Sequence, residues 1–501
     1  MPNFFSYFRS TKELSLGNNY FTGNFPSSII NLTQLKGLDL SNNSLTGSIP
    51  SNISGYQDLV LLFLGTNLLT STIPSWVFSL PSLIYLDLEY NQLTGQLYDF
   101  QYQSLQRIYL SGNKLDGPLP KSISKLVNLT LLDLSSNNFS SVVEASLFSN
   151  CNQLQMLDLS SNNLFLATDG VNSSNLPKSL AYLYLSSCGI KDLDFLLPTN
   201  NLYRLDLSKN MLRGQIFLDQ KWYNWSEGLY HLNLSHNFLT NMHQLPFQSL
   251  SLLDLSSNLL HGPMFVPPLT ISFFITSDNN LSGEIPSSIC KLGSLVVLDL
   301  SKNNLSGVIP QCLGNASVGL LVELEVLDIG DNNLNGTFPW WLGNLPKLQV
   351  LSLRTNNLQG PLTLTTNKTQ PSFSALKIID LSHNEFTGVL PARFFRKLVS
   401  KKEINGSRTP LNYIGDQEYQ DTTVVPQPPP PPELDQEEND EFFNGFIWKV
   451  VLIEYGWGMV IGMIMGCLIF LTGKPKWFNR IVHEEGNKLV GKKRPKYVKW
   501  L

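Results

Sequence analysis

The chain has 501 residues, of which 42% are hydrophobic, and a formal net charge of −4 at pH 7. The charge is uneven, because residues 473–501 carry nine Lys or Arg and two Glu, which leaves a net charge of −11 on residues 1–472. A nucleic-acid partner would need a basic surface on the larger part of the chain, and the sequence excludes one there.

The first ten residues, MPNFFSYFRS, have neither the apolar run nor the small-residue cleavage site of a secretory signal. The repeats that follow begin without a polar or cysteine-bearing cap, although terminal repeats need a polar outer face for solubility. We therefore expect the chain to be truncated at its N-terminus relative to a longer precursor.

One pattern, Leu-x-x-Leu-x-Leu-x-x-Asn-x-Leu-x-Gly-x-Ile-Pro, fills most of residues 1–393 and is clearest from Leu295 to Pro310. Its spacing, roughly 21 to 29 residues, is that of leucine-rich repeats. We count about sixteen units, including a partial one around Leu14. The others begin at Leu35, Leu59, Leu83, Leu105, Leu129, Leu154, Leu180, Leu202, Leu229, Leu250, Ile271, Leu295, Leu324, Leu348 and Leu376.

The pattern has a mechanical interpretation. Leu298 and Leu300 point to one face of a short strand and Asp299 to the other. Stacking joins the strands into a parallel ladder over one continuous core, inside which Asn303 and its equivalents bond backbone groups. Cys188 takes the place of this Asn in one repeat, where a small buried side chain fits. The sequence thus predicts an α/β solenoid, a leucine-rich-repeat superhelix with a parallel strand ladder on its concave face, plus one transmembrane helix.

The repeats are less regular between residues 129 and 270, where Gln220–Glu227 forms an aromatic-rich insertion. Such an insertion either contacts a partner or covers local core.

The concave face holds the candidate ligand-binding residues. An acidic row recurs at one strand position, which is a solvated strand face or, alternatively, an Asp-based site: Asp39, Asp87, Asp133, Asp158, Asp206, Asp254, Asp299, Asp328 and Asp380. Exposed aromatic and Arg side chains are the usual anchors of interfaces. We therefore assign ligand binding to the positions that break the Asp pattern, namely Phe63, Tyr85, Tyr109, Tyr184 and Arg354.

The sequence contains no motif that indicates catalysis, a metal site or a cofactor, so we expect no enzyme activity. Its five cysteines suit neither a disulfide-dense scaffold nor a zinc site. Cys290 and Cys312 lie one repeat apart and stack on the convex side, so they either form a disulfide or remain two buried thiols.

Several Asn-x-Ser/Thr sequons lie outside the turn in which the repeat itself generates them, which supports an extracellular, glycosylated surface. They are Asn31, Asn52, Asn128, Asn172, Asn224, Asn315 and Asn367.

The remaining segments form a tail. Residues 394–425 carry no repeat, and residues 426–445 are Pro-rich and then acidic, which indicates a stiff stalk or, alternatively, an SH3-type ligand. Within residues 446–472, Val450–Leu471 is long enough to cross a bilayer. Acidic residues precede this span and basic residues follow it, so we expect the N-terminus outside and residues 473–501 to form a short basic cytoplasmic tail. We expect the basic residues of this tail to contact anionic lipid headgroups.

Three glycines repeat at intervals of four along this span, and they give a second helix close access. We assign Gly458, Gly462 and Gly466 to an interface with a partner helix.

Several landmarks together resemble the plant receptor-like proteins, the group that contains the tomato Cf-type resistance proteins. They include the Leu-x-Gly-x-Ile-Pro spelling, the Cys290 to Cys312 segment, Ile378–Gly388, Phe446–Lys449 and Gly473–Trp477. The resemblance implies a single-pass plasma-membrane receptor without a kinase. Such a receptor binds an extracellular peptide, protein or glycan and signals in defence through a partner receptor kinase at the glycine face.

Relative to that family, we expect residues 394–425 to be a remnant of the non-repeat island. The last repeats and the C-terminal cysteine cap are expected to be missing before Pro426. The alternative functions are a developmental peptide co-receptor, a non-signalling decoy of the enzyme-inhibitor type, and a non-functional fragment.

Overall fold

The computed structural model describes residues 10–51, 56–167, 176–216, 222, 225–241, 245–314, 321–362 and 373–389. Contacts divide the chain into two units, Met1–Ile404 and Asn405–Leu501, and all the described residues belong to the first. Among them no helix is long and apolar enough to span a bilayer. The predicted span Val450–Leu471 lies outside the described residues.

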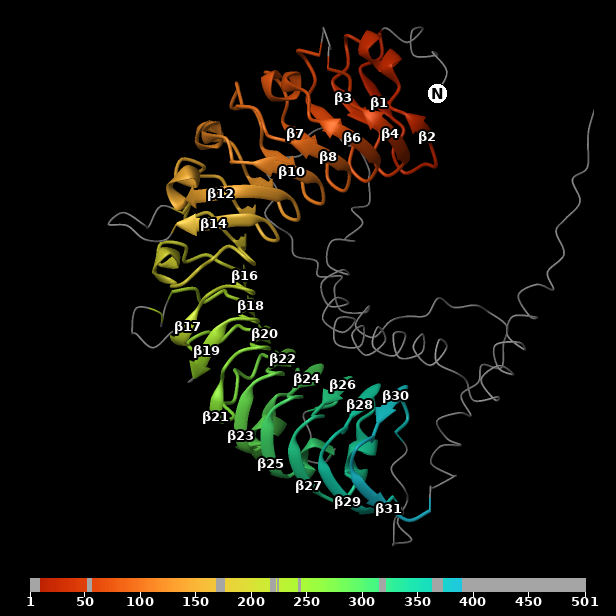
Figure 1. Cartoon of the computed structure of the whole chain (residues 1–501), viewed down its shortest axis with the longest axis vertical. Helices are drawn as coiled ribbons and strands as arrows, with labels where there is room; N and C mark the ends of the chain where they lie inside the picture. The colour runs from red at the N-terminus through yellow and green to blue at the C-terminus, as the bar shows by residue number, and fades with distance from the viewer. Residues whose placement is uncertain are drawn as a thin grey trace, which may run out of the picture. The chain divides into compact units, whose positions relative to one another are not determined.

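Each repeat contributes one three-residue strand to a parallel sheet of sixteen strands, which lines the inner side of the curved repeat unit (Figure 1). In chain order these inner strands are β1 Glu13–Ser15, β3 Gly37–Asp39, β5 Leu61–Phe63, β7 Tyr85–Asp87, β9 Arg107–Tyr109, β11 Leu131–Asp133, β13 Met156–Asp158, β15 Tyr182–Tyr184, β16 Arg204–Asp206, β18 His231–Asn233, β20 Leu252–Asp254, β22 Phe273–Ile275, β24 Val297–Asp299, β26 Val326–Asp328, β28 Val350–Ser352 and β30 Ile378–Asp380.

A second set of strands follows the Asn of the repeats and forms three separate parallel sheets beside the inner one (Figure 1). The first has seven strands, β2 Thr22–Asn24, β4 Ser44–Ser48, β6 Leu68–Thr72, β8 Gln92–Gly95, β10 Lys114–Gly117, β12 Asn138–Glu144 and β14 Asn163–Ala167. The second has two, β17 Arg213–Gln215 and β19 Phe238–Asn241. The third has six, β21 His261–Pro263, β23 Asn280–Glu284, β25 Asn304–Val308, β27 Asn333–Gly336, β29 Asn357–Pro361 and β31 Glu385–Thr387.

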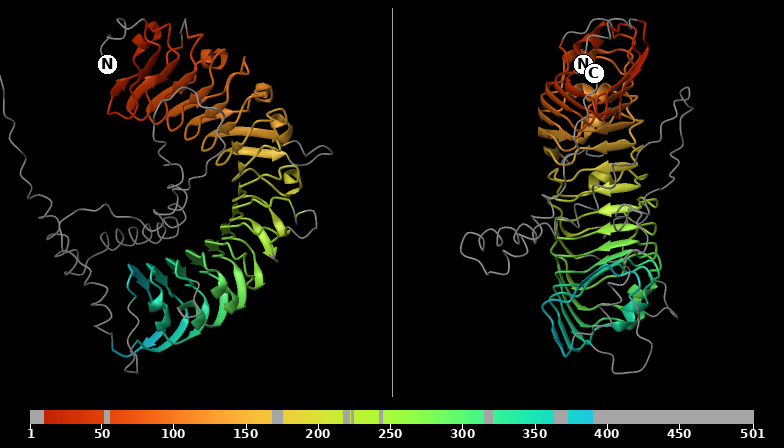
Figure 2. Two further views of the ribbon diagram at one scale, coloured as in Figure 1. Left: turned by 180° about the vertical axis from the view of Figure 1, so that it is seen from behind. Right: turned by 90° about the vertical axis from the view of Figure 1, so that its right-hand side faces the viewer.

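The outer connections correct the α/β prediction, because the helices found in them are short 3₁₀-helices and the described residues contain no α-helix. Most of these turns follow the proline that closes the repeat, which fixes the first φ, and too few residues remain before the next strand for an α-helix. These helices are η2 Ser27–Asn31, η3 Ser75–Ser79, η4 Lys121–Lys125, η5 Ala145–Phe148, η6 Asp194–Leu196, η8 Ser287–Lys291, η9 Gln311–Gly314 and η10 Trp340–Asn344. The solenoid is therefore a parallel β-solenoid (Figure 2).

The core is a column of leucines, of which Leu298 and Leu300 are completely buried. Beside it runs the row of ladder asparagines. Asn303 donates from Nδ2 to the carbonyl oxygens of Thr276, Leu300 and Ser301 at 2.9–3.1 Å, and its Oδ1 accepts from the backbone N–H of Leu281 at 3.0 Å. Because each amide joins two repeats, the ladder fixes their register as well as satisfying buried carbonyls.

The residue before each ladder Asn has a left-handed backbone in nearly every repeat, as at Ser136 with φ 52°. His236 and His383 occupy this turn position with φ 54° and 56°, so their recurrence reflects the repeat. The predicted aromatic insertion covers core, since Trp222 and Trp225 are each 4% exposed and the Trp225 Nε1–H donates to the carbonyl of Leu196 at 2.8 Å.

Candidate ligand-binding face

Two rows of side chains project from the inner sheet away from the core. In each strand the central residue is the core leucine or its equivalent, and the first and third residues face outward. The parallel register places all nine predicted Asp residues in the row of third residues, as in the pairs Asp133 with Asp158 and Asp299 with Asp328.

These aspartates hold the turn that follows the strand. Asp133 Oδ1 accepts from the backbone N–H of Ser135 at 2.9 Å and from its hydroxyl at 2.7 Å, and Asp254 binds Ser256 in the same way. One carboxylate oxygen is therefore committed within the repeat. The acidic row is a structural element of the turns and is partly withdrawn from solvent, since Asp133 is 0% and Asp254 is 3% exposed.

Burial of like charges on adjacent strands affects proton binding along this row. Burial, with a smaller contribution from neighbouring aspartates, raises the pKa of Asp87 and of Asp254 to about 6 each. Burial likewise raises the pKa of Glu89 to about 7, with Asp87 and Asp133 contributing. The pKa of Asp158 is also raised, first by burial and then by Asp133. At neutral pH the inner face is therefore less negative than its formal charge.

A first aromatic patch, defined as Phe63, Tyr85, Arg107 and Tyr109, lies on β5, β7 and β9. The Phe63 and Tyr85 rings meet edge to face with centroids 4.7 Å apart, and Tyr85 stacks on Tyr109 at 5.4 Å. The Arg107 guanidinium carbon lies 5.6 Å from the Tyr85 ring centroid. The three rings are half-buried and Arg107 is exposed, so the patch presents a fixed aromatic surface beside a cation.

A second aromatic patch, defined as Tyr182, Tyr184, Tyr203, Arg204 and Tyr230, lies on and just before β15, β16 and β18. Tyr203 stacks on Tyr230 at 5.1 Å, and the Arg204 guanidinium carbon lies 6.0 Å and 5.8 Å from the ring centroids of Tyr182 and Tyr203. Burial raises the pKa of Tyr184 well above its ordinary value, so its phenol keeps its proton.

His231 lies beside this second patch, with its ring 4.9 Å from that of Tyr230. Burial, together with the nearby Arg204, lowers the pKa of His231 to about 3. The imidazole is therefore neutral at physiological pH.

The structure brings together three of the five predicted ligand-binding residues, Phe63, Tyr85 and Tyr109. Tyr184 lies three strands further along with Arg204, and Arg354 lies apart near the other end of the sheet. The structural reason given for two of the five assignments is wrong. Both were assigned to the row of third strand residues, in place of Asp. Tyr85 instead lies in the row of first residues, where it pairs with Leu61 and Arg107. In β28 the third residue is Ser352, and Arg354 lies two residues after it.

Five residues were missed, and each lies next to or within a strand whose phase the leucines define: Arg107, Tyr182, Tyr203, Arg204 and Tyr230. The available signal was the recurrence of Tyr and Arg at the first strand position or just before it. Only the register between strands shows that these side chains, more than 20 residues apart in sequence, are neighbours.

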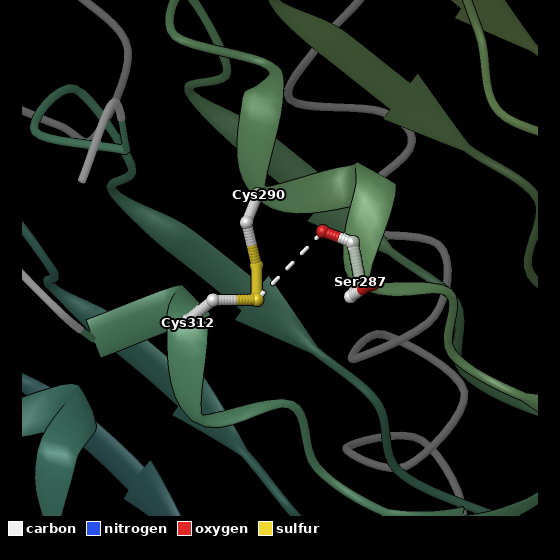
Figure 3. The surroundings of a disulfide bond; sticks show 3 residues. All are labelled: Ser287, Cys290 and Cys312. Carbon is white, nitrogen blue, oxygen red and sulfur yellow. Dashed lines mark hydrogen bonds between the residues drawn. A yellow bond between two sulfur atoms is a disulfide. The ribbon is translucent and has the colours of Figure 1, made fainter. Parts of the chain in front are cut away.

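Other assigned positions lie away from this face. Cys290 and Cys312 form a disulfide between η8 and η9, with their Cα atoms 5.9 Å apart (Figure 3). The Cys312 sulfur also lies 3.7 Å from the carbonyl oxygen of Ser287.

Two of the assigned sequon residues, Asn31 and Asn128, are exposed. The other assigned positions lie outside the described residues: Asn52, Asn172, Asn224, Asn315, Asn367, Gly458, Gly462 and Gly466. Within the described residues no group of three His, Cys, Asp or Glu could hold a metal ion.

Comparisons with known proteins agree with this geometry. Leucine rich repeat family models match residues 38–93, 57–115 and 103–164, and also 10–32, 294–316, 323–345 and 375–396. Among curated proteins, Receptor-like protein 53 of Arabidopsis thaliana is 34% identical over 385 residues, covering 62% of this chain and 37% of the relative. Receptor-like protein 18 of the same plant is 34% identical over 370 residues, covering 62% and 42%.

The chain therefore carries leucine-rich repeats, and it is similar in sequence to plant receptor-like proteins. It spans less than half the length of those two relatives.

Solved structures of plant receptors share the fold of this chain. The peptide hormone receptor RGFR1 in complex with RGF2 superposes with a TM-score of 0.63 at 28% identity, covering 79% of this chain and 67% of that one. The Arabidopsis receptor kinase HAESA in complex with the peptide hormone IDA and the co-receptor SERK1 has a TM-score of 0.54 at 29% identity, with coverage of 79% and 73%.

Proposed function

We propose that this chain is the ligand-binding part of a kinase-less, non-catalytic cell-surface receptor that binds an extracellular peptide on the inner face of the solenoid. The single observation that carries this proposal is the first aromatic patch. Its rings contact one another on three adjacent strands, and Arg107 stands exposed beside them.

The physical argument starts from rigidity. The strands that carry the patch are held by the backbone ladder, and Asn91 and Asn113 beneath them join neighbouring repeats, as in the bond from Asn113 Nδ2 to the Leu88 carbonyl at 2.9 Å. A ligand that binds a fixed surface pays little ordering cost on the receptor side, and Tyr and Arg supply large contact area. A peptide is favoured over a protein or a glycan because related solved receptors are complexes with peptide hormones.

Signalling belongs to the proposal as well. We propose a plasma-membrane location with the repeats outside and a partner receptor kinase that packs on Gly458, Gly462 and Gly466, because close helix packing needs small residues. The proposed role is defence, and a developmental peptide co-receptor is the second candidate because the related peptide complexes contain hormones.

The test uses the full chain, secreted with an added signal and immobilised. It is exposed to size-fractionated peptides from extracellular fluid of infected and of uninfected plants, and retained peptides are identified by mass spectrometry. The triple variant Y85A/R107A/Y109A should weaken binding of the retained peptide by about tenfold or more. The matched control is Y98A/Y102A, which removes two tyrosines that are 50% and 48% exposed and lie outside the sheet strands.

Equal affinity of the triple variant and the unchanged chain would remove the inner-face assignment. A peptide retained only from infected plants supports defence, and one retained from healthy tissue supports the developmental role. Binding without co-purification of any receptor kinase from plant membranes would identify a decoy.

A further inference from the structure

Three neighbouring repeats in the middle of the solenoid expose an apolar side chain where other repeats are polar. Met211, Phe238 and Leu259 each follow a ladder Asn directly and are 40%, 42% and 54% exposed. With the exception of Leu68, the equivalent position in the other Asn-bearing repeats from β4 onward is polar: Ser44, Gln92, Lys114, Asn138, Asn163, Asn280, Asn304, Asn333, Asn357 and Glu385. Met211, Phe238 and Leu259 are called the lateral stripe below.

The stripe is continuous along the solenoid. The backbone N–H of Phe238 donates to the Leu212 carbonyl at 2.8 Å, and that of Leu259 donates to the Leu239 carbonyl at 2.9 Å. These bonds place Phe238 opposite Arg213 and Leu259 opposite Thr240, so each stripe residue is a diagonal neighbour of the next on an adjacent chain, about 8 Å away. Single exposed apolar residues are ordinary on protein surfaces, whereas a contiguous apolar patch marks an interaction site.

The core does not explain these side chains. The residues after them, Leu212, Leu239 and Leu260, already fill the core position and are 0–1% exposed. The stripe also coincides with the short two-stranded sheet β17–β19, between the longer lateral sheets that end at β14 and begin at β21 (Figure 1).

Positive charge flanks the stripe on both sides. Lys209 lies on the turn side, while Arg213 and Lys191 lie on the opposite side, and all three are exposed. The Arg213 guanidinium carbon is 4.9 Å from the Phe238 ring centroid, so the cation lies over the apolar surface. The nearby acids are Asp192, beside Lys191, and Asp278, which accepts from the Ser257 hydroxyl at 2.9 Å. These cations stand out in a region of the chain whose net charge is negative.

The spacing and the two flanks together define the partner. Three stripe residues span about 16 Å, which matches an apolar face made of positions i, i+4, i+7 and i+11 of an α-helix. A helix also carries polar residues on both sides of its apolar stripe, whereas an extended strand turns its polar residues directly away from the surface. Cations on both flanks are complementary to acids on both flanks of such a helix.

We propose that the lateral stripe binds an acidic amphipathic helix of a partner protein. The site lies on a different face from the aromatic patches, and it does not depend on the proposed peptide function. The partner's apolar residues cover Met211, Phe238 and Leu259, and its Glu or Asp side chains pair with Lys191, Lys209 and Arg213.

The test measures binding of defined synthetic helices to the full 501-residue chain by fluorescence anisotropy. The probe has Leu at i, i+4, i+7 and i+11 with Glu on both flanks. One control peptide replaces Glu by Lys, and another scrambles the Leu positions. The acidic helix should bind saturably, and added salt should weaken its binding.

The decisive variant is M211N/F238N/L259N. Asn occupies the same position in other repeats, as at Asn280 and Asn304, so the substitution preserves the repeat. We expect the dissociation constant of the acidic helix to rise by about tenfold or more. L68N is the matched control because Leu68 holds the equivalent position and is 45% exposed, but has polar neighbours, Ser44 and Gln92, in the adjacent repeats.

Equal binding of the acidic helix to the unchanged chain and the triple variant would overturn the proposal. So would an absence of saturable binding, or equally tight binding of the Lys peptide. Sedimentation of the unchanged chain and of the triple variant tests for self-association. If the unchanged chain self-associates and the triple variant does not, a second copy of the chain occupies the stripe, and the proposal is overturned.

Discussion

The repeats up to β14 and from β21 onward differ from the central repeats, β15 to β20, in the lateral sheet. The inner sheet is continuous through both regions, whereas the lateral sheet is broken in the centre. Asn210 in the centre donates to the Leu185, Leu207 and Ser208 carbonyls at 2.8–3.0 Å, which is the same arrangement as at Asn303. The inner sheet therefore depends on the leucines and the Asn, and these persist in both regions.

The lateral sheet varies more from repeat to repeat than the inner sheet does. In the regular repeat of β25, Gly307 has φ 77°, a conformation that L-residues rarely adopt, and a Cβ there would lie 2.8 Å from the Glu284 Cγ. In the repeat of β15, Ile190–Leu193 replaces this close and the described residues form no lateral strand, whereas β12 and β14, which also lack the Gly, pair over five residues. One side of a solenoid can thus vary without disturbing the other.

The largest expected effect comes from core substitutions, which compare how tightly the core is packed in the two regions. Leu205 in the centre and Leu298 in a regular repeat are 1% and 0% exposed. Replacing either by Ala should lower the free energy of unfolding by about 2 to 5 kcal/mol, through lost transfer energy and the cavity left behind. Urea titration with hydrogen exchange in each region provides the measurement. A cost for Leu205→Ala below half of that for Leu298→Ala would show that the centre is the looser region.

The next effect concerns pH and should be common to both regions. Asp87 lies in a regular repeat and Asp254 in the centre, and burial raises the pKa of each to about 6. A carboxyl whose pKa is higher in the folded state than in the unfolded chain makes its full contribution to stability when the pH is below its unfolded pKa, about 3.9. That contribution is lost as the pH rises through the folded pKa, about 6. Lowering the pH from 7 to 4 should therefore raise the contribution of each carboxyl by on the order of 2 to 3 kcal/mol.

D87N and D254N provide the matched variants for this pH effect, because an amide cannot titrate. Each should flatten the dependence of the urea midpoint on pH by a similar amount. A curve of unchanged steepness would contradict the raised pKa values.

The smallest expected effect comes from restoring an Asn at the described ladder position that lacks one. Cys188 holds the Asn position, and its Sγ lies 3.8 Å from the Leu159 carbonyl oxygen and 3.7 Å from that of Ser186. Cys188→Asn places a strong amide donor against the same carbonyls and should stabilise the protein by about 1 kcal/mol. Cys188→Ala, which supplies no donor, is the control. If both variants change the thermal midpoint equally, the gain does not come from the amide.

Sequence reasoning recovered the parts of the molecule that follow from periodicity. The inner strands, the buried leucines, the Asn ladder and the placement of Cys188 all follow from residue spacing within one repeat. The α/β description failed because spacing alone does not distinguish one 3₁₀ turn from a short α-helix in the outer segment, where Pro310 leaves few residues before the chain must return.

The candidate site was recovered only in part, because it depends on contacts between repeats. Tyr85 and Tyr109 were selected as exposed aromatics, but their stacking results from a register that joins residues 24 apart. Arg107 and Arg204 were not assigned to the site, because nothing in the sequence of their own repeats distinguishes them from other exposed arginines. Their importance comes from the rings on the preceding strand, which a single repeat does not reveal.

The disulfide between Cys290 and Cys312 has a consequence for how the solenoid comes apart. Each repeat is held mainly by its two neighbours, so a stack of repeats frays from its ends. Fraying that begins at β31 moves repeat by repeat towards η9, where a covalent link to η8 resists the separation of one repeat from the next. The bond therefore acts as a stop against unzipping, and it protects the lateral stripe and both aromatic patches from damage that begins at the C-terminal edge.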